Sequence, residues 1–293
     1  MPYRFLCGLL LIMSVLQLGG CITDTIDDTY GNRLVEAQVE FDPGKSVVVD
    51  GENGDITIRR VAGTTAKVRA DIRAKGEDRI AAVQVIMQTN LYGDLILRVD
   101  WPIGWRQPGE AATIDLELPG CLGLTVHTGN GAIEVSGLGG TAILNSGNGE
   151  IAVHDHAGDL EASTSNGTVR AERISGECRV RTSNGQVELN EVAGRVSVAT
   201  TNGPVEAALT QENPGPVDIR TANGRVELTI GSGFTGDLRL ETFNGSIRID
   251  GVRGEQELDD EREWAVVHRG GEDARRSLIR TTNGRILLRQ HPE

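Results

Sequence analysis

The fold is decided by residues 160–207, which read LEASTSNGTVRAERISGECRVRTSNGQVELNEVAGRVSVATTNGPVEA. The dipeptide Asn-Gly recurs in this stretch every 18 residues, at Asn166, Asn184 and Asn202. Over the whole chain of 293 residues it occurs nine times, with Asn at 53, 130, 148, 166, 184, 202, 223, 244 and 283. Apart from the first interval of 77 residues, the copies are 18, 21 or 39 residues apart. A fixed period of this length is the signature of a repeat architecture.

The residues around each Asn-Gly are apolar at fixed positions. The third residue after Asn is Ile or Val in all nine copies. The fifth residue after Asn and the fourth before it are always Val, Ile, Leu or Ala. Apolar and mostly polar residues alternate on both sides, which is the period of a strand with one buried face. We therefore expect two short strands to flank each Asn-Gly, and the dipeptide to turn the chain through positive φ values.

Hairpin arrays and coils both use Asn-Gly turns, but only a coil requires every copy to bury the same positions in register. When windings stack at about 4.8 Å, each strand pairs in parallel with its copies above and below. The sequence thus predicts an all-β fold, a single-stranded parallel β-helix (β-solenoid) with about 18–21 residues per winding. We expect the 39-residue interval, equal to 21 plus 18, to hide one winding without Asn-Gly.

Composition fits a narrow interior and limits the kinds of partner. Aromatic residues make up only 3% of the chain, as expected where Val, Ile, Leu and Ala fill a core too slim for rings. The formal net charge is −13. A surface with this net negative charge repels phosphate groups, whereas nucleic-acid binders need a concentrated basic surface. We therefore expect no nucleic acid as a partner.

A longer motif connects the repeats to a known family. Eight of the nine copies read Thr/Ser-x-Asn-Gly, and Glu117-Leu118-Pro119-Gly120 stands ahead of them. With these motifs the chain resembles the bacterial putative-adhesin domain family of exported β-helix proteins, over about residues 40 to 290. The resemblance implies a single-stranded parallel β-helix and implies no catalytic residues.

The N-terminus carries an export signal. Arg4 precedes an apolar run from Leu6 to Leu18, too short to span a membrane, and Leu18-Gly19-Gly20-Cys21 resembles the lipobox of bacterial lipoproteins. This predicts cleavage before Cys21, its acylation, and membrane contact through the N-terminal lipid. The alternative is an ordinary signal peptide cut nearby, which leaves Cys21 a free thiol. By resemblance to lipoproteins generally, Ile22 after the cysteine implies the outer membrane of a Gram-negative bacterium.

These patterns divide the chain into segments. Residues 1–20 are expected to be the signal peptide and residues 21–39 a lipidated tether. The solenoid follows over residues 40–290, with irregular first windings at 40–120 and regular windings at 121–250. Residues 251–290 form a charged excursion and a C-terminal cap, because an open strand edge would recruit other chains.

Few side chains suggest a reactive or metal-binding role. We expect Cys121 and Cys178 to be free thiols, since about three windings separate them and bridged Cα atoms lie within about 7 Å. In His154-Asp155-His156 we expect His156 to be a corner histidine, because the repeat places no third metal ligand.

The fourth position after Asn stacks Glu188, Glu206 and Glu227 on successive windings. This column either binds a cation or a basic partner, or forms a solvated acidic face. We favour the acidic face because Arg170 and Arg248 stand at the two ends of the column.

The corner asparagines and two tryptophans each have a structural and a ligand-binding interpretation. The corner asparagines either form a stacked amide ladder, which we favour, or present amides to a glycan. Trp101 and Trp105 either stack on sugars or, as we prefer, cover the first windings as a cap.

The sequence favours a non-enzymatic, lipid-anchored cell-envelope protein, an adhesin or surface-binding scaffold that presents its repetitive face to another envelope protein or a glycan. Two alternatives stay open. A polysaccharide-acting β-helix enzyme needs carboxylates converging with Lys or Arg in a groove, and the repeat places no such cluster. An accessory protein of envelope stress signalling is suggested by the resemblance alone. We expect no cofactor and no catalytic residues.

Overall fold

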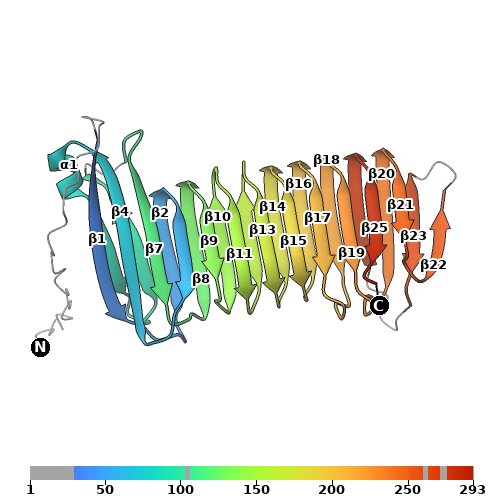
Figure 1. Ribbon diagram of the computed structural model, residues 1–293, viewed down its shortest axis with the longest axis horizontal. Coiled ribbons are helices and arrows are strands. Elements are labelled where there is room, and N and C mark those ends of the chain that lie inside the picture. The colour runs from blue at the N-terminus through green and yellow to red at the C-terminus, as the bar shows by residue number, and fades with distance from the viewer. Residues whose placement is uncertain (1–29, 103–105, 260–262, 271–275, 293) are drawn as a thin grey trace, which may run out of the picture.

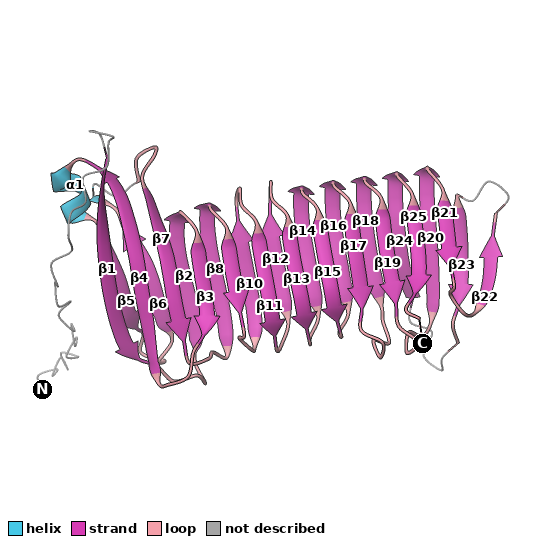
Figure 2. Ribbon diagram, in the orientation of Figure 1, coloured by secondary structure: helices cyan, strands magenta, loops and turns pink. Residues whose placement is uncertain are grey.

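Two long β-sheets face each other along a rod in the computed structural model, which describes residues 30–102, 106–259, 263–270 and 276–292 (Figure 1). In spatial order, sheet A contains β1 (Tyr30–Glu40), β4 (Thr65–Lys75), β7 (Ala111–Leu118), β3 (Ile56–Arg60), β9 (Ile133–Ser136), β11 (Ile151–His156), β13 (Val169–Ile174), β15 (Val187–Val192), β17 (Val205–Leu209), β19 (Val226–Ile230), β25 (Ile286–Gln290) and β21 (Ile247–Asp250). Sheet B contains β22 (Glu255–Leu258), β23 (Trp264–His268), β20 (Asp237–Asn244), β24 (Arg276–Asn283), β18 (Val217–Asn223), β16 (Val196–Asn202), β14 (Cys178–Asn184), β12 (Leu160–Thr164), β10 (Thr141–Ser146), β8 (Gly123–Asn130), β2 (Ser46–Asn53), β6 (Leu95–Asp100) and β5 (Gln84–Thr89). One short helix, α1 (Glu77–Ala82), lies at the N-terminal end (Figure 2).

Each regular winding contributes one strand to sheet B, turns at Asn-Gly, and contributes the next strand to sheet A. Neighbouring windings pair in parallel and in register. Val180 lies beside Val198 in sheet B, and Val187 lies beside Val205 in sheet A. From β8 to β19 the windings follow the 18- and 21-residue spacing of Asn-Gly. The predicted parallel β-solenoid is confirmed.

The core is the space between the two sheets, filled by the alternate apolar positions of every winding. These side chains are at most 4% exposed in the central windings, among them Val180, Val198, Ile219, Val187, Val205 and Val226. Each fully buried Val, Ile or Leu contributes about 1.5–3 kcal/mol. A slip of one residue would turn a whole set to solvent, so burial fixes the register. Among the described residues, the buried rings of Phe41, Trp101 and Phe234 lie in loops outside the repeated positions.

The predicted reason for the Asn-Gly glycines, a positive φ value, is wrong for all but one of them. Glycine is required at these corners because the backbone of the neighbouring winding lies too close for a Cβ. Of the nine, only Gly54 has a positive φ, of 119°. A Cβ on Gly167 or Gly185 would instead lie 1.9 or 1.8 Å from the carbonyl oxygen of the corresponding glycine one winding earlier. The corners stack so closely that only glycine fits, because backbone meets backbone there.

The C-terminal end departs from chain order. The winding β24–β25 is inserted between β18–β19 and β20–β21, so that Asn283 pairs with both Asn223 and Asn244. The predicted extra winding in the 39-residue interval is therefore wrong. In its place β22 and β23 form antiparallel strands on the free edge of β20 (Figure 1). The last winding in the sequence is thus internal, and the acidic strand β22, with Glu255 and Glu257, forms the exposed edge.

The N-terminal end is closed in a similar way. The winding β2–β3 lies between β6–β7 on one side and β8–β9 on the other. Beyond β7, sheet A continues through the antiparallel strands β4 and β1, and beyond β6, sheet B ends at the antiparallel strand β5. The buried side chain of Glu110 accepts hydrogen bonds from Arg79 and from the Gln107 backbone N–H, which ties α1 to the start of β7.

The predicted tether is too long. Residues 30–39, assigned to it, form most of β1, whose alternate side chains Val35, Ala37 and Val39 pack against the core. The predicted signal peptide, Cys21 and Trp105 lie outside the described residues. None of the helices in the described ranges has the length and apolar character needed to cross a membrane.

Candidate binding surfaces

Eight asparagines form one hydrogen-bonded ladder along an edge of the rod. In each of its seven steps a side-chain N–H of one asparagine donates to the side-chain oxygen of the next, with N···O distances of 2.7–2.9 Å. In spatial order the Asn ladder consists of Asn130, Asn148, Asn166, Asn184, Asn202, Asn223, Asn283 and Asn244. The predicted stacked amide ladder is confirmed. Asn53 lies outside it and donates to the Glu110 carbonyl at 2.9 Å.

Buried hydroxyl groups support the ladder from inside. Ser146 donates to the Gly131 carbonyl at 2.8 Å, and Thr164 donates to the Gly149 carbonyl at 3.0 Å. The same bond recurs in other windings, and it explains why Thr or Ser stands two residues before Asn in the repeat. Hydroxyl, glycine carbonyl and amide together fix successive corners to one another, except at Thr200, whose buried hydroxyl has no hydrogen-bond partner.

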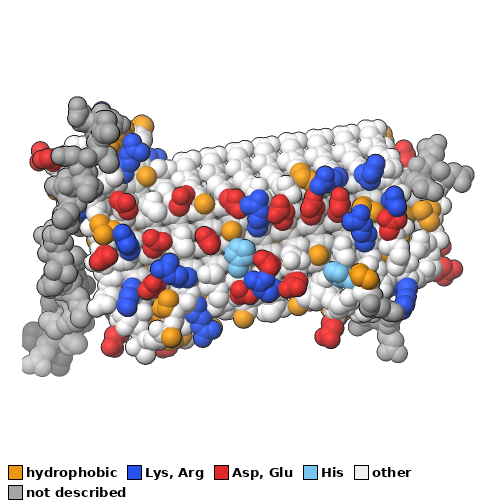
Figure 3. Space-filling model, in the orientation of Figure 1, with side chains coloured by type: hydrophobic (Ala, Val, Ile, Leu, Met, Phe, Trp, Pro, Cys, Tyr) orange, Lys and Arg blue, Asp and Glu red, His pale blue; other side chains and the backbone are white. Residues whose placement is uncertain are grey.

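The Asn ladder faces solvent, since all eight asparagines are exposed. A primary amide has two N–H donors and two acceptor sites on its oxygen, and one ladder bond on each side leaves one of each. Over the regular windings the upper edge of the rod is a band without charged or hydrophobic side chains (Figure 3). The edge therefore presents a rigid, uncharged and regularly spaced set of hydrogen-bonding groups.

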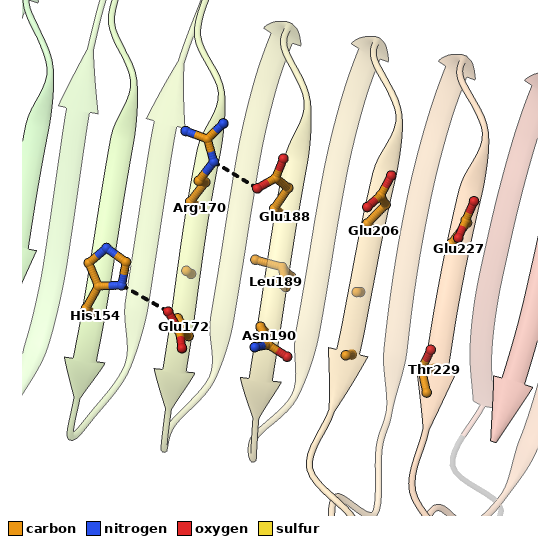
Figure 4. A pocket seen from close by; sticks show the side chains of 12 residues that line it. His154, Arg170, Glu172, Glu188, Leu189, Asn190, Glu206, Glu227 and Thr229 are labelled. Carbon is orange, nitrogen blue, oxygen red and sulfur yellow. Dashed lines mark hydrogen bonds and ion pairs between the residues drawn. The ribbon is translucent and has the colours of Figure 1, made fainter. Parts of the chain in front are cut away.

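The outer face of sheet A carries rows of acidic and basic side chains along the rod (Figure 3). Glu188, Glu206 and Glu227 lie in register on β15, β17 and β19, as predicted. They form one wall of a shallow groove of about 420 Å³, and His154, Glu172, Asn190 and Thr229 line the other (Figure 4).

Arginines neutralise this acidic column. Arg170 Nε lies 2.8 Å from Glu188, and Arg225 pairs with both Glu206 and Glu227. The glutamate column is therefore a solvated face whose negative charges are compensated by arginines. No three metal-ligating side chains converge anywhere in the part of the chain that the structure describes.

Arg248 does not stand at the end of the column, contrary to the sequence prediction. The inserted strand β25 places Leu287 between Glu227 and Arg248 in the register. Arg248 Nε instead lies 2.8 Å from Asp250 on its own strand. The prediction failed because it assumed that windings stack in chain order.

The two histidines of the His154-Asp155-His156 segment lie on opposite faces of sheet A. His156 is 1% exposed and its Nε2 lies 3.0 Å from the Gly140 carbonyl, so the predicted corner histidine is confirmed. Burial lowers the pKa of His156, against the opposing effect of its carbonyl partners. His154 is on the outer face, with Nδ1 3.3 Å from Glu172.

Both described cysteines are free and buried, as predicted. Burial raises the pKa of the Cys121 thiol to about 11. Burial, with the nearby charge of Glu177, raises that of Cys178 to about 12. Thiols with such pKa values are protonated at neutral pH and are poor nucleophiles.

Trp101 offers no sugar-stacking surface. Its side chain belongs to the core at the N-terminal end and the residue is only 6% exposed. This burial agrees with a role in covering the first windings. A different aromatic residue, Phe243 on β20, was not among the predicted candidates and is 71% exposed. Its signal was readable: Phe243 stands directly before an Asn of the ladder, where other ladder windings carry only Gly, Ala, Ser or Thr.

Comparison with known proteins gives the family and supports the fold. Residues 100–289 match the family described as Toastrack DUF4097. No curated protein matches the chain. A crystal structure of a putative adhesin from Bacteroides fragilis is similar over 88% of this chain and 97% of its own, with 12% identity and a TM-score of 0.50.

Two other solved structures are similar to this chain with lower TM-scores. A putative adhesin from Parabacteroides distasonis has 8% identity and a TM-score of 0.38, and a putative lipid binding protein from the same species has 12% identity and a TM-score of 0.40. Each is covered over 97% of its length and covers 88% of this chain. The family match spans well over half of the chain and agrees with the resemblance to the putative-adhesin domain. This protein belongs to the Toastrack DUF4097 family.

Proposed function

We propose that the protein is a non-enzymatic, lipid-anchored scaffold of the bacterial cell envelope that binds a partner along its rod, as an adhesin or surface-binding protein. The Asn ladder is the observation that carries this proposal. Its exposed amides are fixed in line by hydrogen bonds and by the hydroxyls beneath them. The seven steps of the ladder span about 34 Å at normal strand spacing. Solenoids typically bind through extended faces of this kind.

The partner that suits this edge is itself long and hydrogen-bonding, either a glycan or the exposed edge of another envelope protein. The ladder has a repeat set by strand spacing and carries no charge, so it complements hydroxyl and amide groups better than ions. The rigid backbone limits the entropy lost on binding.

The proposal includes export and anchoring through Cys21 in the outer membrane of a Gram-negative bacterium, which rests on residues 6–22. Labelling cells with an alkyne palmitate analogue tests this part. We expect labelled protein in the outer-membrane fraction, and loss of label together with release from the membrane in Cys21→Ser. Unlabelled wild-type protein would contradict the anchor and leave the binding role to be tested by itself.

Site-specific photocrosslinking in living cells tests the binding role. Probes at Ser165 and Ser183 flank the Asn ladder and are exposed, whereas a probe at the exposed Ala193 lies at the opposite corner of the winding and serves as the matched control. We expect crosslinked products from the first two positions and few from the third. Equal products from all three positions would argue against a partner on this edge. Release of unsaturated oligosaccharides from a polysaccharide by purified protein would support the enzyme alternative.

A further inference from the structure

Two aromatic side chains lie exposed on the outer face of sheet B near the C-terminal end of the rod. Phe243 on β20 is 71% exposed and Trp264 on β23 is 39% exposed. Trp264 pairs directly with Glu241 in the antiparallel register, so Phe243, two residues beyond Glu241, is its diagonal neighbour on the same face. Diagonal neighbours of this kind are about 7–8 Å apart, within reach of aromatic rings. We refer to these two side chains, which the register places within reach of each other, as the aromatic platform.

The solenoid does not need a ring at position 243. The seven other ladder windings carry small residues at this position, namely Gly129, Gly147, Ser165, Ser183, Thr201, Ala222 and Thr282. Phe243 leaves most of its surface in water and so contributes little to packing. Adjacent exposed apolar surface that packing does not explain indicates contact with another molecule.

The polar groups beside the platform compensate one another. Glu241 pairs with Arg239 on its own strand, and its Oε2 lies 3.5 Å from Nε of Arg280 on β24. Arg280 remains 65% exposed at its side chain. The exposed residue Thr282 lies beside Phe243 in the parallel pair β20–β24. On the other side of the rings, Asp259 Oδ1 accepts from the Trp264 backbone N–H at 3.1 Å, and Glu263 is exposed. The surface thus offers donors and acceptors around two rings, with additional carboxylates beside Trp264.

We propose that Phe243 and Trp264, with Glu241 and Arg280, form a carbohydrate-binding platform. Sugar rings present C–H groups that pack on aromatic faces, and their hydroxyls accept from a guanidinium and donate to a carboxylate. The compensated Glu241 and the carboxylates beside Trp264 favour a hydroxyl-rich ligand over an anionic one. A membrane surface fits less well, because the carboxylates of Asp259 and Glu263 beside Trp264 oppose anionic headgroups. The inference rests on the binding role proposed above, for which it names a ligand class and a location.

The experiment uses the full mature protein in detergent micelles and measures binding by calorimetry to cellohexaose, chitohexaose and a hexagalacturonate. Phe243→Ser introduces the residue found in two other windings, Ser165 and Ser183, and should preserve the fold. Trp264→Ser removes the second ring. Tyr92→Ser is the matched control, since Tyr92 is 78% exposed in the loop between β5 and β6 at the other end of the rod. Vesicles of phosphatidylglycerol and phosphatidylcholine form a separate arm.

We expect at least one hexasaccharide to bind, and each platform variant to weaken that binding about tenfold or more. The Tm of Phe243→Ser should stay within about 2 °C of wild type, as for other surface changes, and Tyr92→Ser should bind as wild type does. The inference is overturned if none of the three sugars binds, if the platform variants bind as tightly as wild type, or if Phe243→Ser loses binding to vesicles instead. In each of these cases crosslinking from Ser165 and Ser183 still decides the proposed function independently.

Discussion

The side-chain nitrogen of Asn283 lies 2.7 Å from the side-chain oxygen of Asn223, although 60 residues separate them. Asn244, which is closer in the sequence, is one step farther along the Asn ladder and donates to Asn283 at 2.8 Å. The C-terminal winding has therefore been placed inside the solenoid, where both of its edges are paired. The free edge belongs to β20 and is covered by β23. The hydrogen bond between Asn283 and Asn223 thus shows that the windings do not stack in chain order.

Replacing asparagines in the Asn ladder should cost stability in proportion to the ladder bonds removed. Asn283→Ala removes two such bonds, whereas Asn130→Ala, at the end of the ladder, removes one. At about 1 kcal/mol per net hydrogen bond, we expect losses of about 2 and about 1 kcal/mol in the free energy of unfolding. Urea denaturation followed by circular dichroism measures both. Equal losses at the two positions would show that the ladder bonds do not contribute separately.

The Asn-Gly glycines should not tolerate even alanine. In Gly185→Ala the new Cβ would lie 1.8 Å from the Gly167 carbonyl oxygen, and the stacked corners leave no direction in which to yield. We expect a loss of more than about 3 kcal/mol or failure to fold.

Gly31→Ala is the control for this change. Its Cβ would meet only the end of the Ile80 side chain, at 3.6 Å. Its stability should stay within about 0.5–1 kcal/mol of wild type. A folded Gly185→Ala protein with wild-type stability would refute the crowding argument.

The buried carboxylate at the N-terminal end should make stability depend on pH. Burial acts to raise the pKa of Glu110, but hydrogen bonds from Arg79 and from the backbone N–H groups of Gln107 and Lys75 outweigh it and lower the pKa overall. A lowered pKa means that the stabilisation is fully present above the ordinary carboxyl pKa and is lost as pH falls through the folded-state value.

Glu110→Gln removes this titrating group and its ion pair with Arg79. We expect its Tm at pH 7 to be at least about 5 °C below that of wild type, with the difference shrinking as the pH is lowered towards 3. Thermal melts at several pH values provide the measurement. Glu117→Gln, at the exposed pair with Arg59, is the matched control and should change the Tm little. A pH-independent difference would contradict the assignment.

The two core thiols should be inert in the folded protein. With pKa values of about 11 and 12, Cys121 and Cys178 contain almost no thiolate at pH 8, and both are buried. Lipidated mature protein should give no reaction with a disulfide reagent when folded and two thiols after denaturation. A third thiol after denaturation would show that Cys21 is not acylated. A mass increase of two hydrogens on reduction would show a disulfide and contradict the prediction.

The repeat made much of the fold predictable, because each winding buries the same local pattern. The inward positions, the pairing of Glu188 with Glu206 and the amide ladder all follow from an alternation read within one winding and copied to the next. The corner glycines show where local reasoning failed. Their identity follows from the approach of a neighbouring winding, a contact that no single turn contains.

The candidate binding surface was predicted less well. Phe243 stands at a repeat position that otherwise carries small residues, and Trp101 stands outside the repeat, but the sequence does not give their exposure, which is 71% for Phe243 and 6% for Trp101. Trp264 becomes the neighbour of Phe243 only because the charged excursion returns as an antiparallel strand on β20. The sequence assigned that segment to a surface excursion and a cap, and could not show which strand it pairs with.

The sequence by itself determined that the chain coils into parallel windings with a narrow aliphatic core, because a period-2 alternation repeated in register leaves no other way to bury every apolar column. Only the tertiary structure decided the spatial order of the last windings. Asn223, Asn244 and Asn283 stand in the same local pattern, so each of their windings presents an equivalent edge and core surface to the others. In the structure β24 lies between β18 and β20, and β23 covers the other edge of β20. These long-range pairings leave no periodic trace in the sequence.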